Sequence, residues 1–165
     1  CVISGPKGSR EVAVEDFCTG PGKNVLTAGE LLVEIKFPAR AANSGSHYRR
    51  FIPRNEMDIA VVGVGASVVL DESKQNFVSA RISLAAVGPT PLFAKAAGDA
   101  LAGQPVNDES IAKAAAAAKE IATPITDMRG PAEYRTHLVG VLVERVVNAA
   151  VAQARGEALC HRIGH

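Results

Sequence analysis

Two long apolar segments separated by a short polar one constrain the fold of this chain most. Residues 59–70 and 77–87 have the pattern of two long strands, and the polar segment 71–76 between them is short. Strands joined so directly run antiparallel, because a parallel pair needs a longer crossover. The pattern therefore predicts a β-hairpin at the centre of a largely antiparallel sheet. Shorter strands are expected at residues 11–14, 31–38 and 46–51, the second of them half-buried from Val33 onward.

The second half of the chain is rich in alanine and predicts helices. Gly88-Pro89-Thr90-Pro91 ends the strand pattern. Asn107 or Asp108 can cap the helix that contains the alanine run, and Pro131 suits the first turn of the last helix. The fold class is therefore α+β, an antiparallel sheet followed by a three-helix cluster. The expected helices cover residues 92–101, 108–122 and 132–154, and the buried stripe of the last one contains Leu138, Val141, Leu142, Val146 and Ala149.

Composition excludes several classes of function. A chain of 165 residues suits one domain, or a small domain with a fragment of another. The net charge of +1 gives no support for a nucleic-acid partner or an anionic membrane surface, and no apolar run approaches the roughly 20 residues of a membrane span. Three widely separated cysteines fit a reducing, cytoplasmic compartment better than a disulfide framework. Because the first residue is not methionine, we expect the chain to begin inside a longer protein.

Ionisable side chains are concentrated between Tyr48 and Asp58, directly before the first long apolar segment. Three arginines and two acids lie within these eleven residues. Arginine supplies a fixed positive charge that a carboxylate can orient. Two interpretations follow: a structural salt-bridge cluster, or a site for an anionic or electron-rich planar ligand. The ionisable residues are Arg49, Arg50, Arg54, Glu56 and Asp58.

Four other motifs favour structural interpretations. Gly63-Val64-Gly65 lies in mid-strand and lacks the third glycine of a dinucleotide loop, so it indicates close packing within the sheet. Gly20-Pro21-Gly22-Lys23 indicates a turn, because Pro21 lacks the N–H donor that a phosphate loop needs. The charges from Asp127 to Arg135 fit an ion-pair cluster at a helix start. Cys160 to His165 offers metal ligands, but on a tail with no supporting carboxylate.

Five segments, in order, make the chain similar to the C-terminal part of the FAD-binding medium subunit of molybdenum hydroxylases. This family includes the relatives of xanthine dehydrogenase, carbon monoxide dehydrogenase and aldehyde oxidase. The resemblance covers nearly the whole chain apart from the final tail. The segments are Asp16-Phe17 with Gly20–Lys23, Gly29–Leu32 leading to Phe37-Pro38, Arg54–Ala66, Leu84–Pro91, and Pro124–Gly130 with Glu133-Tyr134-Arg135.

The resemblance implies a division of the chain and a set of flavin-site residues. Residues 1–40 would be the end of an FAD-binding domain, 41–155 the flavoprotein C-terminal domain, and 156–165 a tail. By resemblance, Leu32 lies near the isoalloxazine ring and Arg50 beside the polar edge of the flavin. Arg54 and Asp58 fall in the adjacent loop, which modulates the surroundings of the flavin and the access of the electron acceptor. No residue of this chain is expected to be catalytic.

The resemblance also implies electron transfer within a complex. In this family a large subunit with a molybdopterin cofactor oxidises the substrate, and [2Fe–2S] clusters on a small subunit carry electrons to FAD. The flavin then reduces NAD or another acceptor. The expected protein is an oxidoreductase subunit, cytoplasmic, with no nucleic-acid partner and no membrane span. The alternative is a non-catalytic interaction module of the same fold that binds no flavin; a domain with a small-molecule ligand of its own is a third reading.

Overall fold

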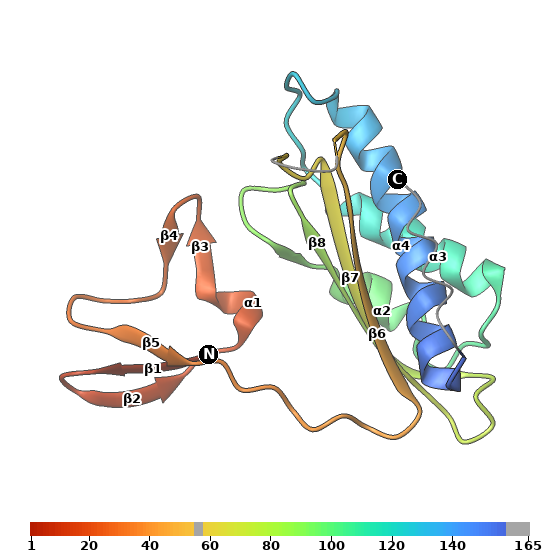
Figure 1. Cartoon of the computed structure of the whole chain (residues 1–165), viewed down its shortest axis with the longest axis horizontal. Helices are drawn as coiled ribbons and strands as arrows, with labels where there is room; N and C mark the ends of the chain where they lie inside the picture. The colour runs from red at the N-terminus through yellow and green to blue at the C-terminus, as the bar shows by residue number, and fades with distance from the viewer. Residues whose placement is uncertain (55–57, 158–165) are drawn as a thin grey trace.

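The computed structural model describes residues 1–54 and 58–157, which form a small lobe and a large lobe joined by an extended segment (Figure 1). The small lobe contains β1 (Val2–Gly5), β2 (Gly8–Glu11), α1 (Val14–Phe17), β3 (Cys18–Gly20), β4 (Lys23–Asn24) and β5 (Leu31–Glu34). The large lobe contains β6 (Ser44–Phe51), β7 (Val62–Leu70), β8 (Phe77–Ala85), β9 (Leu92–Phe93), α2 (Lys95–Asp99), α3 (Asp108–Glu120) and α4 (Ala132–Arg155).

The sheet of the large lobe is antiparallel and has the strand order β6-β7-β8-β9. β7 and β8 form the predicted central hairpin, paired from Gly63 opposite Ala85 to Leu70 opposite Phe77. Residues along β7 alternate between the two faces, as a pleated strand requires. The α+β class and the antiparallel sheet are therefore confirmed. The β7 side chains that are buried against the helices are Val62, Val64, Ala66, Val68 and Leu70.

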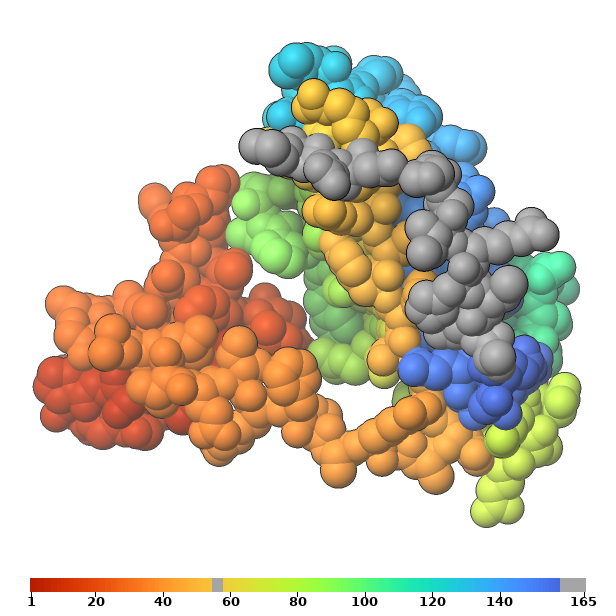
Figure 2. Space-filling model, viewed as in Figure 1, coloured from red at the N-terminus to blue at the C-terminus, as the bar shows by residue number. Residues whose placement is uncertain are grey.

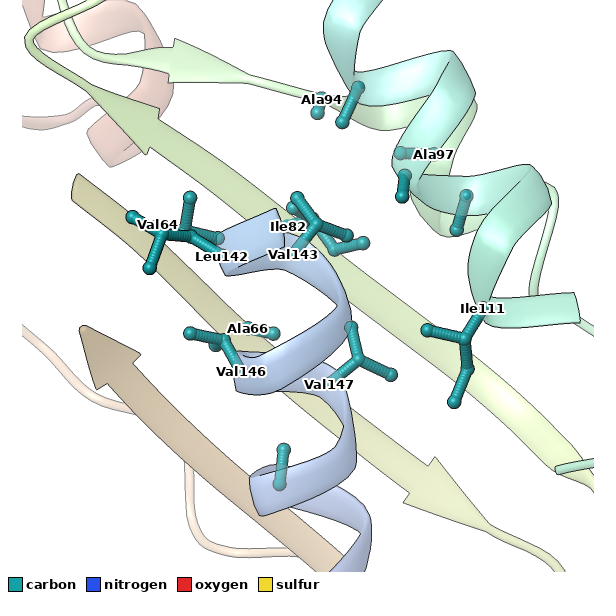
Figure 3. Close-up of a cluster of buried hydrophobic side chains, with 14 of the residues drawn as sticks. Val64, Ala66, Ile82, Ala94, Ala97, Ile111, Leu142, Val143, Val146 and Val147 are labelled. Atoms are coloured by element: carbon teal, nitrogen blue, oxygen red, sulfur yellow. The ribbon is translucent and has the colours of Figure 1, made fainter. Parts of the chain in front are cut away.

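Helices cover only one face of this sheet. α4 lies across β6 and β7, α3 packs on α4, and α2 packs on β8. The core lies between these two layers and consists mainly of small and branched aliphatic side chains, together with Phe77 (Figure 3). Asn107 is the N-cap of α3, where its side chain accepts a hydrogen bond from the Ser110 backbone N–H at 2.9 Å.

The buried surface of α4 is wider than the predicted stripe. Val141 and Ala149 are only half-buried. Because α4 contacts α3 as well as the sheet, it buries two adjacent rows of side chains rather than one. The buried apolar residues are Leu138, Val139, Leu142, Val143, Val146, Val147, Ala150, Val151 and Ala154.

The small lobe corrects three expectations from the sequence. The strand predicted at 11–14 is wrong, because β2 ends at Glu11 and α1 begins at Val14. The strand predicted at 31–38 is confined to β5, and all of its residues are exposed rather than half-buried. Its sheet, of order β2-β1-β5, carries no helix layer among the described residues, so the alternating side chains of β5 have no second layer to pack against.

In the large lobe, the helix predicted from residue 92 begins at Lys95, because Leu92 and Phe93 pair with β8.

Two glycines of the large lobe allow its layers to approach closely. A Cβ on Gly45 would lie 1.9 Å from the Ala150 carbonyl oxygen of α4. A Cβ on Gly98 in α2 would lie 2.3 Å from the Ala80 carbonyl oxygen of β8. Both obstacles are backbone atoms, which cannot rotate away as a side chain can. Each position therefore requires glycine for steric reasons.

The carboxylate of Asp71 holds the turn between β7 and β8. It accepts hydrogen bonds from Asn76 Nδ2 at 2.8 Å, from the Ser73 hydroxyl at 2.9 Å and from the Gln75 backbone N–H at 2.9 Å. These bonds favour the ionised form, the Asn76 side chain contributing most, and lower the pKa of Asp71 from 3.8 to about 2.

We expect Asp71→Asn to remove a pH-dependent part of the stability. A carboxyl whose pKa is lowered by folding stabilises the protein above its unfolded value of 3.8, and this contribution is lost as the pH falls towards 2. Thermal unfolding followed by circular dichroism should show a lower Tm for the variant at pH 7 and a shallower fall between pH 4 and 2. Parallel profiles for the two proteins would contradict this assignment.

Candidate functional site

The sheet face that carries no helices bounds a cleft of about 570 Å³ together with the small lobe. Figure 2 shows the hollow between the two lobes. The small lobe contributes Val14, Glu15 and Cys18 to its lining. The large lobe contributes Ser46, His47, Tyr48, Gly65, Ala66, Ser67, Arg81, Ile82, Ser83, Pro91, Leu92 and Phe93.

Strand register places an aromatic ring on the sheet wall of the cleft. Tyr48 lies opposite Gly65, so both face the side away from the helices. A Cβ on Gly63 would lie 2.7 Å from the Tyr48 hydroxyl, and one on Gly65 would lie 3.7 Å from its ring. The tyrosine side chain therefore lies across β7 in space that these glycines leave open, and its exposed surface faces solvent. The interpretation of Gly63-Val64-Gly65 as a close-packing motif is confirmed.

An ion pair connects the small lobe to the sheet across the cleft. Arg81 Nη2 donates to Glu15 Oε1 at 2.8 Å. The Arg81 guanidinium also lies 4.3 Å from the centroid of the Phe93 ring, a cation–π contact. The pKa of Glu15 is lowered, first by a hydrogen bond from its own backbone N–H and then by Arg81. The cleft thus combines aromatic surface, serine hydroxyls and one oriented cation, which suits a planar ligand with a polar edge.

None of the four predicted site residues, Leu32, Arg50, Arg54 and Asp58, belongs to the lining of this cleft. Arg50 is exposed near the end of β6, on the same sheet face as Tyr48. Leu32 is exposed on β5 of the small lobe. The structure brings Arg54 and Asp58 together, since the Arg54 backbone N–H donates to Asp58 Oδ2 at 3.1 Å. Glu56 lies outside the described residues.

Asp58 belongs to an ion-pair network that ends at the start of α4. Its side chain is only 5% exposed, and Oδ1 lies 4.0 Å from Arg129 Nε. Asp127 accepts from the Arg129 backbone N–H at 2.8 Å and from Arg135 Nη2 at 2.6 Å, and these bonds, in that order, lower the pKa of Asp127. The buried Arg135 also donates to the Val61 carbonyl oxygen at 2.9 Å. The ion-pair cluster predicted at this helix start is therefore confirmed.

The arginines of the charged run differ in whether they belong to this ion-pair network. Arg54 and Asp58 have a structural partner in each other, and Asp58 is further tied to Arg129. Arg50 has no ion pair within residues 1–54 and 58–157, so its charge is available on the cleft-facing side of the sheet. Arg54 and Asp58 therefore fit the structural interpretation of the run, and the ligand-binding role of Arg50 stays a prediction.

Sequence reasoning missed most residues that line the cleft. Arg81 carried one signal, because it places a charge in the middle of an otherwise uncharged strand. Glu15 and Phe93 carried none, since their roles depend on how the small lobe and β9 meet the sheet. Tyr48 lay within the charged run, but only the strand register shows which side chains lie beside it.

Residues 1–54 and 58–157 contain no group of three or more His, Cys, Asp or Glu side chains that could hold a metal ion. The terminal segment Cys160 to His165, considered above for metal binding, lies outside the described residues. Among the described helices, none combines the length and the apolar character needed to cross a membrane.

Comparison with known proteins identifies the family of the large lobe. The sequence family described as CO dehydrogenase flavoprotein C-terminal domain matches residues 46–150. The medium chain of carbon monoxide dehydrogenase from Afipia carboxidovorans is 39% identical over 153 residues, which cover 93% of this chain and 52% of that one. The putative xanthine dehydrogenase FAD-binding subunit of Escherichia coli is 31% identical over 156 residues, 94% of this chain and 53% of that one.

Solved structures agree with these relatives. A cyanide-inactivated Cu,Mo-CO dehydrogenase matches with a TM-score of 0.86 and 35% identity, covering 92% of this chain and 52% of that one. Quinoline 2-oxidoreductase from Pseudomonas putida 86 matches with a TM-score of 0.79 and 31% identity, and the match covers 93% of this chain and 52% of that one. The chain spans about half the length of the curated relatives it matches. The resemblance inferred from the sequence is confirmed: the chain belongs to the CO dehydrogenase flavoprotein C-terminal domain family.

Proposed function

We propose that the full-length protein is an FAD-dependent electron-transfer subunit of a molybdenum hydroxylase, and that the cleft receives the flavin ring. The observation that carries this proposal is the exposed Tyr48 ring on a helix-free sheet face, bordered by the Arg81–Glu15 pair. The names of the relatives, medium chain and FAD-binding subunit, support it.

The residues of the cleft fit a flavin ring. An isoalloxazine is planar, apolar at its dimethylbenzene end and rich in hydrogen-bonding atoms at its pyrimidine end. The cleft offers apolar surface from Val14, Leu92 and Phe93, together with serine hydroxyls and the Arg81 guanidinium. Such a mixture of aromatic walls and a few polar groups is typical of small-ligand sites of several hundred Å³.

When bound, FAD supplies one- and two-electron transfer. The residues of this chain would bind and orient the ring: Tyr48 would cover one side of it, and the contact of Leu32 with the ring, which the resemblance implies, would lie outside the cleft lining. Arg50 places a positive charge beside it, which favours the anionic reduced form of the flavin. Arg54 and Asp58 hold the loop next to Arg50 and thereby shape access for the acceptor.

The family resemblance also implies a division of the chain into domains and a route for the electrons. We propose that residues 1–40 complete an FAD-binding domain, that 41–155 form the C-terminal domain, and that 156–165 are a tail. Electrons would come from the [2Fe–2S] clusters of a small subunit, fed by a molybdopterin-containing large subunit, and would pass to NAD or another acceptor. A complex of this kind would work in the cytoplasm.

Arg50→Gln in the full-length protein should lower the reduction potential of the bound FAD. Removing a nearby cation destabilises the anionic reduced flavin, by a shift on the order of 20 mV. A redox titration followed by flavin absorbance measures the shift. Arg145→Gln is the matched control, because Arg145 is exposed on α4, which covers the opposite face of the sheet. Equal reduction potentials of the bound FAD in wild type and Arg50→Gln would show that Arg50 does not act on the flavin.

The alternative, an interaction module that binds no flavin, makes the opposite prediction. A colourless full-length protein without affinity for FAD would support it and exclude our proposal. For the 165-residue chain alone we expect weak or no FAD binding, because it carries no glycine-rich pyrophosphate loop. Tight stoichiometric binding of FAD by this chain, measured by calorimetry, would contradict that expectation.

A further inference from the structure

The described residues of the two lobes pack little on one another. Every pair of helices or strands that packs closely lies within one lobe, and the apolar core consists of large-lobe residues only. Among the described residues of the small lobe, Ile3 is the one buried apolar side chain, and it lies outside that core. The connecting residues 35–42 are exposed (Figure 1). The described part of the chain therefore contains no apolar layer that fixes the small lobe beside the cleft.

A single ion pair joins the described residues of the two lobes. Of the hydrogen bonds and ion pairs between these residues, only the contact of Arg81 Nη2 with Glu15 Oε1, at 2.8 Å, runs from one lobe to the other. We call it the interlobe pair. The Glu15 side chain is 27% exposed and the Arg81 side chain 60% exposed. Both residues line the cleft, so the interlobe pair borders the space that a ligand would occupy.

Each member of the interlobe pair is anchored in its own lobe. Glu15 belongs to α1, and at the end of this helix the Phe17 carbonyl oxygen accepts a hydrogen bond from the Val25 N–H at 3.1 Å. Arg81 belongs to the paired strand β8, and its guanidinium is held against the Phe93 ring, 4.3 Å from the ring centroid. Because both side chains start from fixed backbone, loss of their contact frees the lobes to move apart.

We propose that Glu15 and Arg81 are positioning residues, which hold the small lobe beside the cleft and thereby slow the release of the ligand. The identity of that ligand, the flavin ring, rests on the proposed function. Partly exposed ion pairs shift an equilibrium by about two- to fivefold. A contact of this strength slows release and still opens often enough for the ligand to exchange.

The first test needs no flavin. In the 165-residue chain, Glu15→Gln should raise the radius of gyration measured by small-angle X-ray scattering, with the Tm of the large lobe unchanged because its core is separate. Salt at about 1 M, where the screening length is roughly 3 Å, should raise the radius of wild type and add nothing in Glu15→Gln. Glu109→Gln is the matched control, because it removes an exposed 2.8 Å ion pair within α3.

The second test measures FAD binding in the full-length protein. Glu15→Gln should raise the dissociation constant for FAD about two- to fivefold, mainly through faster release. Glu15 is the decisive position, since Arg81 also offers a polar group to the flavin. The exchanged variant Glu15→Arg/Arg81→Glu should recover part of the compact radius, because it restores an ion pair between the lobes. The recovery is partial, as a carboxylate makes no cation–π contact with Phe93.

The two tests can fail independently. A wild-type radius of gyration in Glu15→Gln would overturn the role of the interlobe pair and leave the flavoprotein assignment intact. An equal increase of the radius in Glu109→Gln would overturn it as well. A full-length protein without affinity for FAD would overturn the proposed function and the retention of FAD by the pair, whereas scattering from the 165-residue chain would still decide whether the pair holds the lobes together.

Discussion

Gly45→Ala is expected to destabilise the large lobe by about 2 to 3 kcal/mol, the typical cost of forcing extra atoms into a packed interface. The added methyl would lie 1.9 Å from the Ala150 carbonyl oxygen and 2.7 Å from the Ala154 nitrogen. Since both atoms belong to the backbone of α4, the helix must move away from β6. That movement also loosens the core beneath it, where Val146 and Val147 pack on the sheet.

Gly140→Ala is the matched control in α4 itself. A methyl there meets only the flexible side chain of Lys119, at 3.3 Å, and replacing glycine within a helix gains up to about 1 kcal/mol of helix propensity. We expect this variant to be neutral or slightly more stable. Denaturant unfolding gives the free energy of unfolding for both. A similar loss of unfolding free energy in both variants would show that the close approach of α4 to β6 is not the reason for glycine at position 45.

Arg135→Met is expected to cost about 2 to 3 kcal/mol. Methionine is close in length but donates no hydrogen bond, so the Val61 carbonyl oxygen and the Asp127 carboxylate both lose a partner. Arg135→Lys should recover only part of the loss, because a single ammonium group cannot bond in the two directions that the guanidinium serves. Hydrogen exchange of the Arg129 and Gly130 amides should accelerate in both variants.

Arg145→Met controls for the loss of one arginine from α4. Arg145 is exposed, and surface substitutions away from specific contacts usually change stability by about 0.5 kcal/mol or less. If Arg135→Met were as stable as Arg145→Met in denaturant unfolding, the network at the start of α4 would have no measurable structural role.

The long elements could be predicted because each carries its own signal. The β7–β8 hairpin follows from two apolar segments with a polar turn, and α3 and α4 follow from caps and spacing. The small lobe could not be predicted in this way. Its strands are short and, apart from the buried Ile3, their side chains are half-buried or exposed, so their pattern reflects no continuous buried face. The sequence therefore suggested a strand where Val14 begins a helix, and gave no sign of β1.

The site residues likewise divide into those that the sequence could indicate and those that it could not. Family resemblance pointed to Arg50, and the structure places it on the cleft-facing side of the sheet. The Arg81–Glu15 pair could not be predicted, because 66 residues separate the two partners and neither belongs to a motif. Tyr48 begins the charged run, but the position of its ring depends on Gly63 and Gly65 of the neighbouring strand. Contacts between distant segments are not visible in a local pattern.

The exposed β5 strand has a practical consequence for anyone who prepares this chain. β5 is an edge strand, and Leu31, Val33, Ile35 and Phe37 expose apolar side chains along it and just beyond. Unpaired edges with apolar side chains are templates for self-association of like strands. Aggregation of the 165-residue chain at high concentration should therefore begin at β5 while the large lobe is still folded, and a lysine at Val33 would be the first change to make for better solubility.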